Sequence, residues 1–142
     1  MNYLIIALAV LAATVANMLI GMLWYSPFFL GSLWKKLANY QPQQSEGKQA
    51  AKVQLAMTGS TLCAVVMASI MACFMHRMHI TSIVSSFHFG WMSWLGFVAT
   101  VTLHGVLFTD SSFVLYLLHN GYNLLSMVVM ALILGIGLRF GA

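Results

Sequence analysis

The chain has 142 residues, of which 61% are hydrophobic and only 6% are charged. Soluble globular domains carry about 25% charged residues, so a water-exposed fold of this composition would present large apolar patches and aggregate. The net charge of +4 rests on six cations, four of them in one short segment, which indicates a topology determinant rather than a nucleic-acid-binding surface.

Four apolar segments organise the chain, and each is long enough to cross a bilayer as a helix. A spanning helix needs about 20 mainly apolar residues. The segments are continuously apolar, whereas a membrane barrel would alternate apolar and polar residues. We therefore predict an all-α, polytopic membrane protein with one domain over residues 1–142 and spans at about 3–25, 55–75, 83–108 and 113–138.

The first predicted span carries a stripe of small residues that should lie against another helix. At helical spacing it presents Ala9, Ala13, Ala16, Asn17 and Gly21. Small residues let two helix backbones approach closely inside a membrane. The segment has no cationic start and is longer than the apolar core of a secretion signal, so we expect it to be retained.

A short amphipathic helix is predicted at 27–39, directly after the first span. Ser26 and Pro27 suit the cap and first position of a helix. One face is apolar (Leu30, Leu33, Trp34, Leu37) and the other is polar (Ser32, Lys35, Lys36, Asn39). This pattern is typical of a helix lying in the membrane interface. An amphipathic turn packed on the bundle is the alternative.

A polar loop is predicted at 40–53, and it sets the expected orientation. The stretch 35–52 contains four lysines, Lys35, Lys36, Lys48 and Lys52. With four spans, Arg77 and Arg139 fall on the opposite side. Because cytoplasmic loops are enriched in Lys and Arg, we expect the lysine-rich loop in the cytoplasm and both termini outside.

The segment around the end of the first span resembles a family signature. It reads Gly-x-x-Trp-Tyr-Ser-Pro, followed by a glycine and a second tryptophan, and comprises Gly21, Trp24, Tyr25, Ser26, Pro27, Gly31 and Trp34. It is similar to a bacterial family of small four-helix integral membrane proteins catalogued as a domain of unknown function. The resemblance continues in Trp94 to Phe97, in the region of Gly121 and Tyr122, and at Gly135. It implies a four-helix fold in a bacterial inner membrane and brings no catalytic or binding residues.

Polar residues within the spans form one predicted cluster. Helix parity places Asn17, Thr100, His104, Asn120 and Asn123 at similar depth toward the lysine-rich side. Ser86, Gly90 and Ser93 share a helix face with two of them. Interhelical hydrogen bonding is the favoured interpretation. The alternative is a polar binding site or proton path with His104 as its titratable member.

Methionine and histidine side chains form a second predicted cluster at the opposite side. Met67, Met71 and Met75 follow at four-residue steps, and Met78 and His79 come next. Thioether and imidazole groups suit Cu(I), so we consider a metal site at Met71, Met75, Met78 and His79. Packing of an apolar core by flexible methionines is the stronger alternative.

The remaining sequence features argue against catalysis. The chain has only two carboxylates and lacks the metalloprotease, nucleophile-elbow and phosphate-loop motifs. Cys63 and Cys73 lie about 15 Å apart along one helix, so they cannot pair, and we expect buried structural thiols. We predict a non-enzymatic helical bundle without cofactor, acting through self-association or a membrane partner. The alternative is an oligomeric transporter of a small solute or of copper-like metal ions.

Overall fold

The computed structural model describes residues 2–38, 46–108 and 112–141, and the regular structure in these ranges is helical. The elements are α1 (Tyr3–Trp24), α2 (Gly31–Leu37), α3 (Glu46–Arg77), α4 (Ile83–Ser93), the π-helical segment η1 (Trp94–Ala99), α5 (Thr100–Phe108) and α6 (Phe113–Gly141). Four stretches are long and apolar enough to cross a membrane: Tyr3–Trp24, Ala51–Arg77, Ile83–Phe108 and Phe113–Gly141. The prediction of an all-α fold with four spans and a short helix after the first is confirmed.

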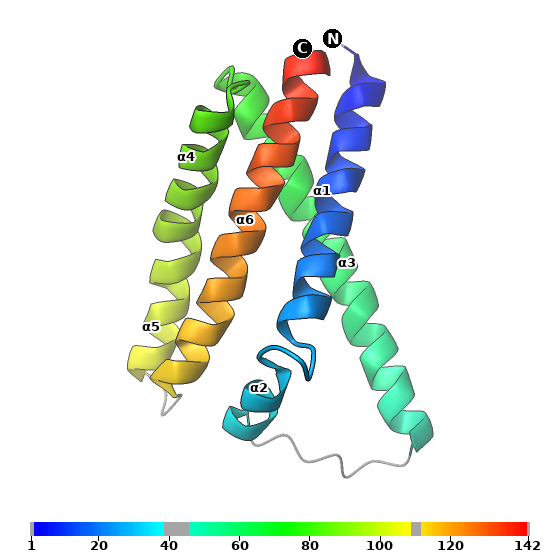
Figure 1. The fold of residues 1–142 in the computed structure, drawn as a ribbon, viewed down its shortest axis with the longest axis vertical. Helices are drawn as coiled ribbons and strands as arrows, with labels where there is room; N and C mark the ends of the chain where they lie inside the picture. The colour runs from blue at the N-terminus through cyan, green and yellow to red at the C-terminus, as the bar shows by residue number, and fades with distance from the viewer. Residues whose placement is uncertain (1, 39–45, 109–111, 142) are drawn as a thin grey trace.

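The central helix of the bundle is α6, which lies between α1 on one side and α4 on the other, with α3 crossing behind (Figure 1). Both termini lie at one end, which we call the terminal end; Arg77 and Arg139 are also there. The other end, which we call the lysine end, holds α2, the start of α3 and the end of α5 (Figure 1). The first half of α3 diverges from the bundle toward that end, and residues 51–58 are all exposed.

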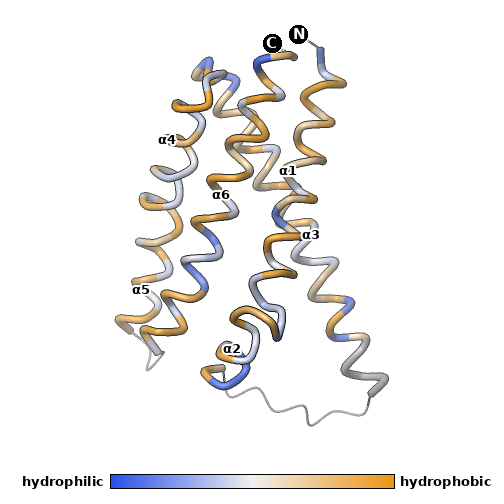
Figure 2. The backbone as a smooth tube through the Cα atoms, in the orientation of Figure 1, coloured by the Kyte–Doolittle hydropathy of each residue, from blue (hydrophilic) through white to orange (hydrophobic). Residues whose placement is uncertain are grey.

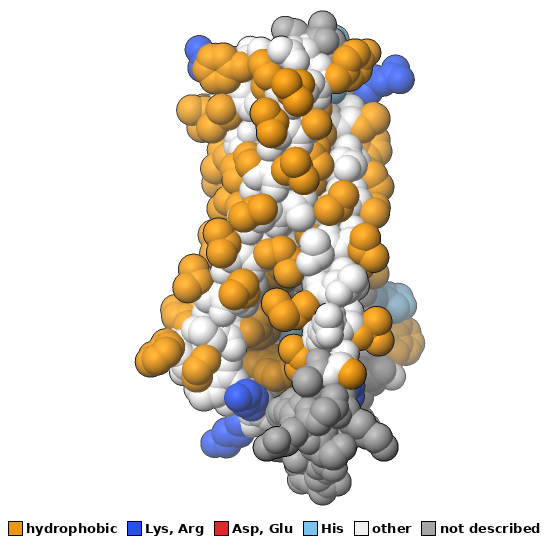
Figure 3. Space-filling model, turned by 90° about the vertical axis from the view of Figure 1, so that its right-hand side faces the viewer, with side chains coloured by type: hydrophobic (Ala, Val, Ile, Leu, Met, Phe, Trp, Pro, Cys, Tyr) orange, Lys and Arg blue, Asp and Glu red, His pale blue; other side chains and the backbone are white. Residues whose placement is uncertain are grey.

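Apolar side chains cover the length of the bundle, and cationic side chains are confined to its two ends. Figure 3 shows this for the face that carries α1 and α3: hydrophobic groups fill the middle, and Lys or Arg groups lie near the top and the bottom. In Figure 2 the hydrophilic segments likewise concentrate near the ends, apart from a polar stretch in the lower part of α6 and a short one at mid-height, where α1 and α3 overlap in the view. An apolar band between two charged ends is the arrangement that a bilayer requires.

Small residues bring α6 close to its two neighbours near the terminal end. Gly137 of α6 lies directly against Ala9 of α1, and Gly135 lies against Ser86 of α4. A Cβ added to Gly90 of α4 would lie 2.8 Å from the Cα of Val128. The predicted small-residue stripe of α1 therefore packs as expected, with Ala9, Ala13 and Asn17 buried.

Two predicted boundaries near the lysine end are wrong. Residues 26–30 form turns instead of starting a helix, because the Ser26 carbonyl accepts hydrogen bonds from the backbone N–H groups of Phe29 and Gly31. The helix α2 begins only at Gly31. The predicted loop 40–53 also ends early, since α3 begins at Glu46; Glu, Gln, Lys and Ala are good helix formers and extend the span outward. Residues 39–45 and the 109–111 turn lie outside the described residues.

The third span changes its inward face at η1. Before η1, Ser86 and Gly90 face α6; Ala99, the last residue of η1, is buried, and beyond it Thr102 contacts Asn120. A π-helical turn takes one more residue than an α-helical turn. Each residue corresponds to a rotation of about 100° in an α-helix. This insertion therefore turns Thr102 toward Asn120 of α6, although Thr102 itself stays exposed, and it turns Thr100 and His104 away from α6.

The two cysteines are exposed, contrary to the sequence-based expectation. Cys63 and Cys73 are free thiols on the outer surface of α3. The inward face of this helix is built instead from Ala64, Ala68, Met71 and Met75. A third or so of the positions on a packed helix face the core, and here alanine and methionine occupy them.

Candidate functional site

A cluster of polar and aromatic side chains joins the end of α1 to α6 at the lysine end. The Trp24 indole N–H donates to the carbonyl of Leu118 (3.1 Å), and the Tyr25 hydroxyl is hydrogen-bonded to His119 Nδ1 (2.7 Å). The Tyr122 hydroxyl donates to Asn17 Oδ1 (3.2 Å). We call these residues the junction cluster: Asn17, Trp24, Tyr25, His119 and Tyr122. Its hydrogen bonds connect residues about one hundred positions apart in the chain.

Glycines allow the junction cluster to form. Gly31 lies directly against the carbonyl groups of Tyr25 and Ser26, so a side chain there would collide with backbone. Gly121 lies beneath the Trp24 ring, where a Cβ would approach Cζ2 to 3.0 Å. Gly21 faces the Tyr122 hydroxyl, 3.4 Å from an added Cβ. The signature glycines therefore serve close packing between α1, α2 and α6.

Aromatic rings complete the junction cluster from α2. The Tyr25 ring lies 6.0 Å from the Trp34 ring and 5.6 Å from the Tyr122 ring. Burial among these groups, with a smaller contribution from Tyr122, raises the pKa of Tyr25 to about 12. The Tyr25 hydroxyl therefore remains protonated and able to donate over the whole physiological range.

A second hydrogen-bonded group ties α5 and η1 to α6. The Asn120 side chain is 3% exposed, and its amide donates to Thr102 Oγ1 (2.9 Å) and to the carbonyl of Tyr116 (3.1 Å). The Trp94 indole donates to the Asn120 carbonyl (3.1 Å), and the Tyr116 hydroxyl donates to the carbonyl of Ala99 (3.1 Å). Asn120 is thus an interhelical hydrogen-bonding residue, as the favoured sequence interpretation holds.

The predicted polar cluster is only partly assembled. Asn17 and Asn120 are buried, but they bond to different partners. Asn123 is half-buried. Thr100 and His104 are exposed, so their predicted inward orientation is wrong, because η1 rotates α5. Sequence reasoning missed Thr102, Tyr116 and His119, whose roles depend on that rotation or on contacts between helices.

Two cavities lie on either side of the Tyr25–Tyr122 pair. One, of about 480 Å³, lies between α5, α6 and Tyr25; most of its wall surface is apolar, but several polar side chains, including Asn123 and His119, also line it. The other, of about 360 Å³, lies between α1, α3 and Tyr122 and is lined mainly by apolar groups such as Met22. Both tyrosines line both cavities. We call the first the polar cavity.

The four residues of the predicted metal site differ in their burial. Met71 and Met75 are buried in the apolar core, whereas Met78 is 62% exposed. His79 is exposed and adopts a left-handed conformation (φ 54°) just past the end of α3. Within the described ranges, no group of three His, Cys, Asp or Glu side chains could hold a metal ion. The two buried methionines act as core packing.

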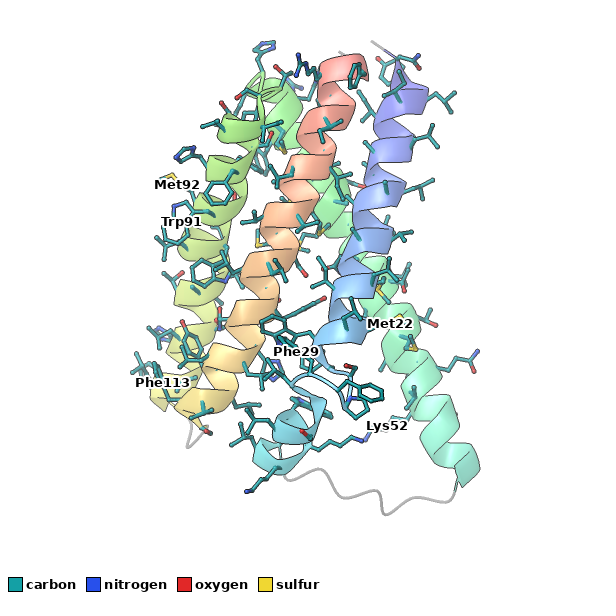
Figure 4. The ribbon with its side chains drawn as sticks, in the orientation of Figure 1. Met22, Phe29, Lys52, Trp91, Met92 and Phe113 are labelled. Atoms are coloured by element: carbon teal, nitrogen blue, oxygen red, sulfur yellow. The ribbon has the colours of Figure 1, made fainter. Side chains whose placement is uncertain are left out.

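A line of exposed residues runs along the outer side of the third span. At four-residue steps these are His88, Met92, Gly96, Thr100 and His104, which we call the outward stripe. Figure 4 shows Met92 and Trp91 directed away from the bundle. The Thr100 hydroxyl donates to the Gly96 carbonyl (2.7 Å), and the His104 ring lies 4.8 Å from that of Phe108. None of the five residues of the stripe is Lys, Arg, Asp or Glu.

A protein-family model described as "Protein of unknown function (DUF1761)" matches residues 8–135. The matched range takes in the junction cluster, the outward stripe and the polar cavity. No curated protein and no solved structure matches the chain.

Proposed function

Because the chain belongs to the DUF1761 family of proteins of unknown function, we propose its function from geometry: a non-enzymatic integral membrane protein that acts by self-association through the outward stripe. The observation that carries this proposal is an inversion along the third span. It has the lowest mean hydropathy of the four (1.4, against 2.1 for α6), yet only 6% of its most apolar window is buried, against 44% for α6. Because polar groups are costly in contact with lipid, the least apolar span would be expected to be the most buried one.

The chemistry of the outward stripe favours a second copy over a different protein. A neutral imidazole carries one donor and one acceptor nitrogen, so His104 is complementary to His104 of a second copy across a two-fold axis. Gly96 and Thr100 are one turn apart, and an added Cβ at Gly96 meets nothing within 4 Å. Small residues at this spacing permit close helix approach in membranes. No Lys, Arg, Asp or Glu lies on the stripe that would require an oppositely charged partner.

Disulfide crosslinking in native membranes tests the proposal. In a Cys63→Ser, Cys73→Ser background, Thr100→Cys should form a covalent dimer on mild oxidation. The matched control is Leu19→Cys on α1, which is 54% exposed. The two positions lie at similar depth, since Asn17 contacts Tyr122 and Thr102 contacts Asn120 on α6. Absence of a dimer at 100, or equal dimer yields at both positions, would contradict the proposal.

We further propose the bacterial inner membrane as the location, with the lysine end in the cytoplasm. The supporting observation is that Lys35, Lys36 and Lys52 lie at one end and two arginines at the other. In intact cells, Arg139→Cys should react with a membrane-impermeant maleimide and Lys52→Cys should not. The reverse labelling pattern would place the lysine end outside.

A second candidate function is an oligomeric transporter of a small solute. The favouring observation is the pair of cavities that share Tyr25 and Tyr122 as a partition. The copper-like variant of this hypothesis has less support, since Met71 and Met75 pack the core. Solute flux into proteoliposomes that is unchanged by Tyr122→Trp would remove the transport hypothesis.

A further inference from the structure

The polar cavity has the size and position of a ligand site. Its volume of about 480 Å³ falls within the range of about 300–1,000 Å³ that small-molecule pockets occupy. It is lined by Tyr25, just past α1, and by Ser112, just before α6, so it opens where the spans end. This is the depth at which the polar head of an amphiphile lies in a bilayer.

Several hydrogen-bonding groups on the cavity wall are already engaged by the fold, but others remain available. Thr102, Tyr116 and Asn120 are bonded to one another or to backbone. The Asn123 side chain makes no hydrogen bond with any residue that the structure describes. His119 uses Nδ1 for Tyr25, which leaves Nε2 for another partner. The cavity therefore offers an amide and an imidazole nitrogen that are available to hydrogen-bond a ligand or water.

The charge of the cavity restricts its ligand. Among the described residues that line it, none is Lys, Arg, Asp or Glu. A charged head group would be transferred from water without an opposite charge, which is unfavourable. An uncharged head with hydroxyl or carbonyl groups could bond to Asn123 and His119. Leu115 and Val106, also on the wall, would contact the adjoining apolar part.

We propose that the polar cavity is a binding site for the uncharged, hydroxyl- or carbonyl-bearing head of a single-chain amphiphile. Asn123 and His119 would hydrogen-bond the head, and the chain would extend from the cavity mouth into the bilayer. This inference is independent of self-association, because the cavity wall and the outward stripe share no residue.

Native mass spectrometry of the full chain in mild detergent tests the site with monooleoylglycerol as the probe. Oleate at pH 8 and free glycerol serve as comparison ligands, since the first adds a charge and the second lacks the chain. Monooleoylglycerol should bind at least about tenfold more tightly than either, corresponding to about 1.4 kcal/mol. Equal binding of oleate would overturn the uncharged head, and equal binding of glycerol would overturn the amphiphile.

Two variants and one control locate the bound probe. Asn123→Leu removes the available amide, and Val106→Phe fills the cavity from α5; each should weaken monooleoylglycerol binding at least about tenfold. Ser69→Leu, at an exposed position of α3, should leave binding unchanged. If the two variants keep their helical circular dichroism and bind as the unaltered chain does, the cavity is not the site. Equal weakening by Ser69→Leu would likewise contradict the assignment.

Discussion

The terminal end and the lysine end of the bundle are built in different ways. At the terminal end, α6 meets α1 and α4 through glycine and alanine, and the helices touch without room for a side chain. At the lysine end, the contacts are long-range hydrogen bonds among Trp, Tyr, His and Asn, and cavities lie between them. From this contrast we propose that the terminal end supplies most of the stability and that the lysine end supplies groups for binding.

The largest expected effect is at the close-packed glycines. In Gly90→Ala the new methyl group would meet the Val128 backbone, which cannot move aside, so the free energy of unfolding should fall by about 2–3 kcal/mol. Gly59 of α3 has nothing within 4 Å of an added Cβ. Gly59→Ala should therefore raise stability by about 0.5–1 kcal/mol, the usual gain inside a helix. Detergent-titrated unfolding in mixed micelles measures the free energy of unfolding of both variants. If the two substitutions changed it in the same direction, the assigned role of the close-packed glycines would be contradicted.

Removing one residue from η1 should have the next largest effect. Deletion of Gly96 would rotate α5 by about 100° and turn Thr102 away from Asn120. The loss of these contacts should lower stability by about 2 kcal/mol. Thr102→Val should then have no additional effect in the deletion background, although it destabilises the intact chain. Deletion of Gly59 in the diverging half of α3 is the control, and a similar loss there would contradict the assigned role of η1.

Hydrogen bonds at the lysine end should each contribute less than the glycine contacts. Asn120→Ala removes two donated bonds and should cost about 1 kcal/mol, within the range measured for polar contacts between membrane helices. Thr58→Ala, whose hydroxyl bonds only within its own exposed helix turn, should change stability little. A cost above that of Gly90→Ala would mean that the lysine end carries the stability.

The smallest expected effect is at Tyr25. Tyr25→Phe removes one hydrogen bond to His119 but keeps the ring contacts with Trp34 and Tyr122, so stability should fall by about 0.6 kcal/mol. Tyr25→Ala also removes the contacts of the Tyr25 ring with Trp34 and Tyr122, so it should lower stability clearly more than Tyr25→Phe does. Equal costs for the two variants, in the same unfolding assay, would show that the hydroxyl dominates the junction cluster.

Regular features of the structure could be predicted from the sequence, because they depend on length and on helical spacing. The four spans and the inward orientation of Ala9, Ala13 and Asn17 follow from apolar runs and small residues one turn apart. The signature around Trp24 and Tyr25 was recognisable as a pattern. Its role was not, since the partners Leu118 and His119 come from α6.

The orientation of His104 could not be predicted by the same reasoning. Helical spacing predicts that Gly90 and His104 lie on the same face of the helix only if every turn between them is α-helical. One extra residue in η1 changes the angular position of every later residue relative to Gly90. The sequence from Trp94 to Ala99 contains no proline, which is a usual sequence signal of a distorted helix. The start of α2 was misplaced for a similar reason, because backbone hydrogen bonds to Ser26 outweigh its capping preference.

Self-association through the outward stripe is the central claim, and spin labelling in a lipid bilayer tests it most directly. A nitroxide attached to Val101→Cys, which is 67% exposed and adjoins Thr100 of the stripe, in the background without Cys63 and Cys73, should show dipolar broadening between copies that disappears on dilution with unlabelled protein. A nitroxide at Leu19→Cys should show none. An unbroadened spectrum at position 101 that does not change on dilution would contradict the claim.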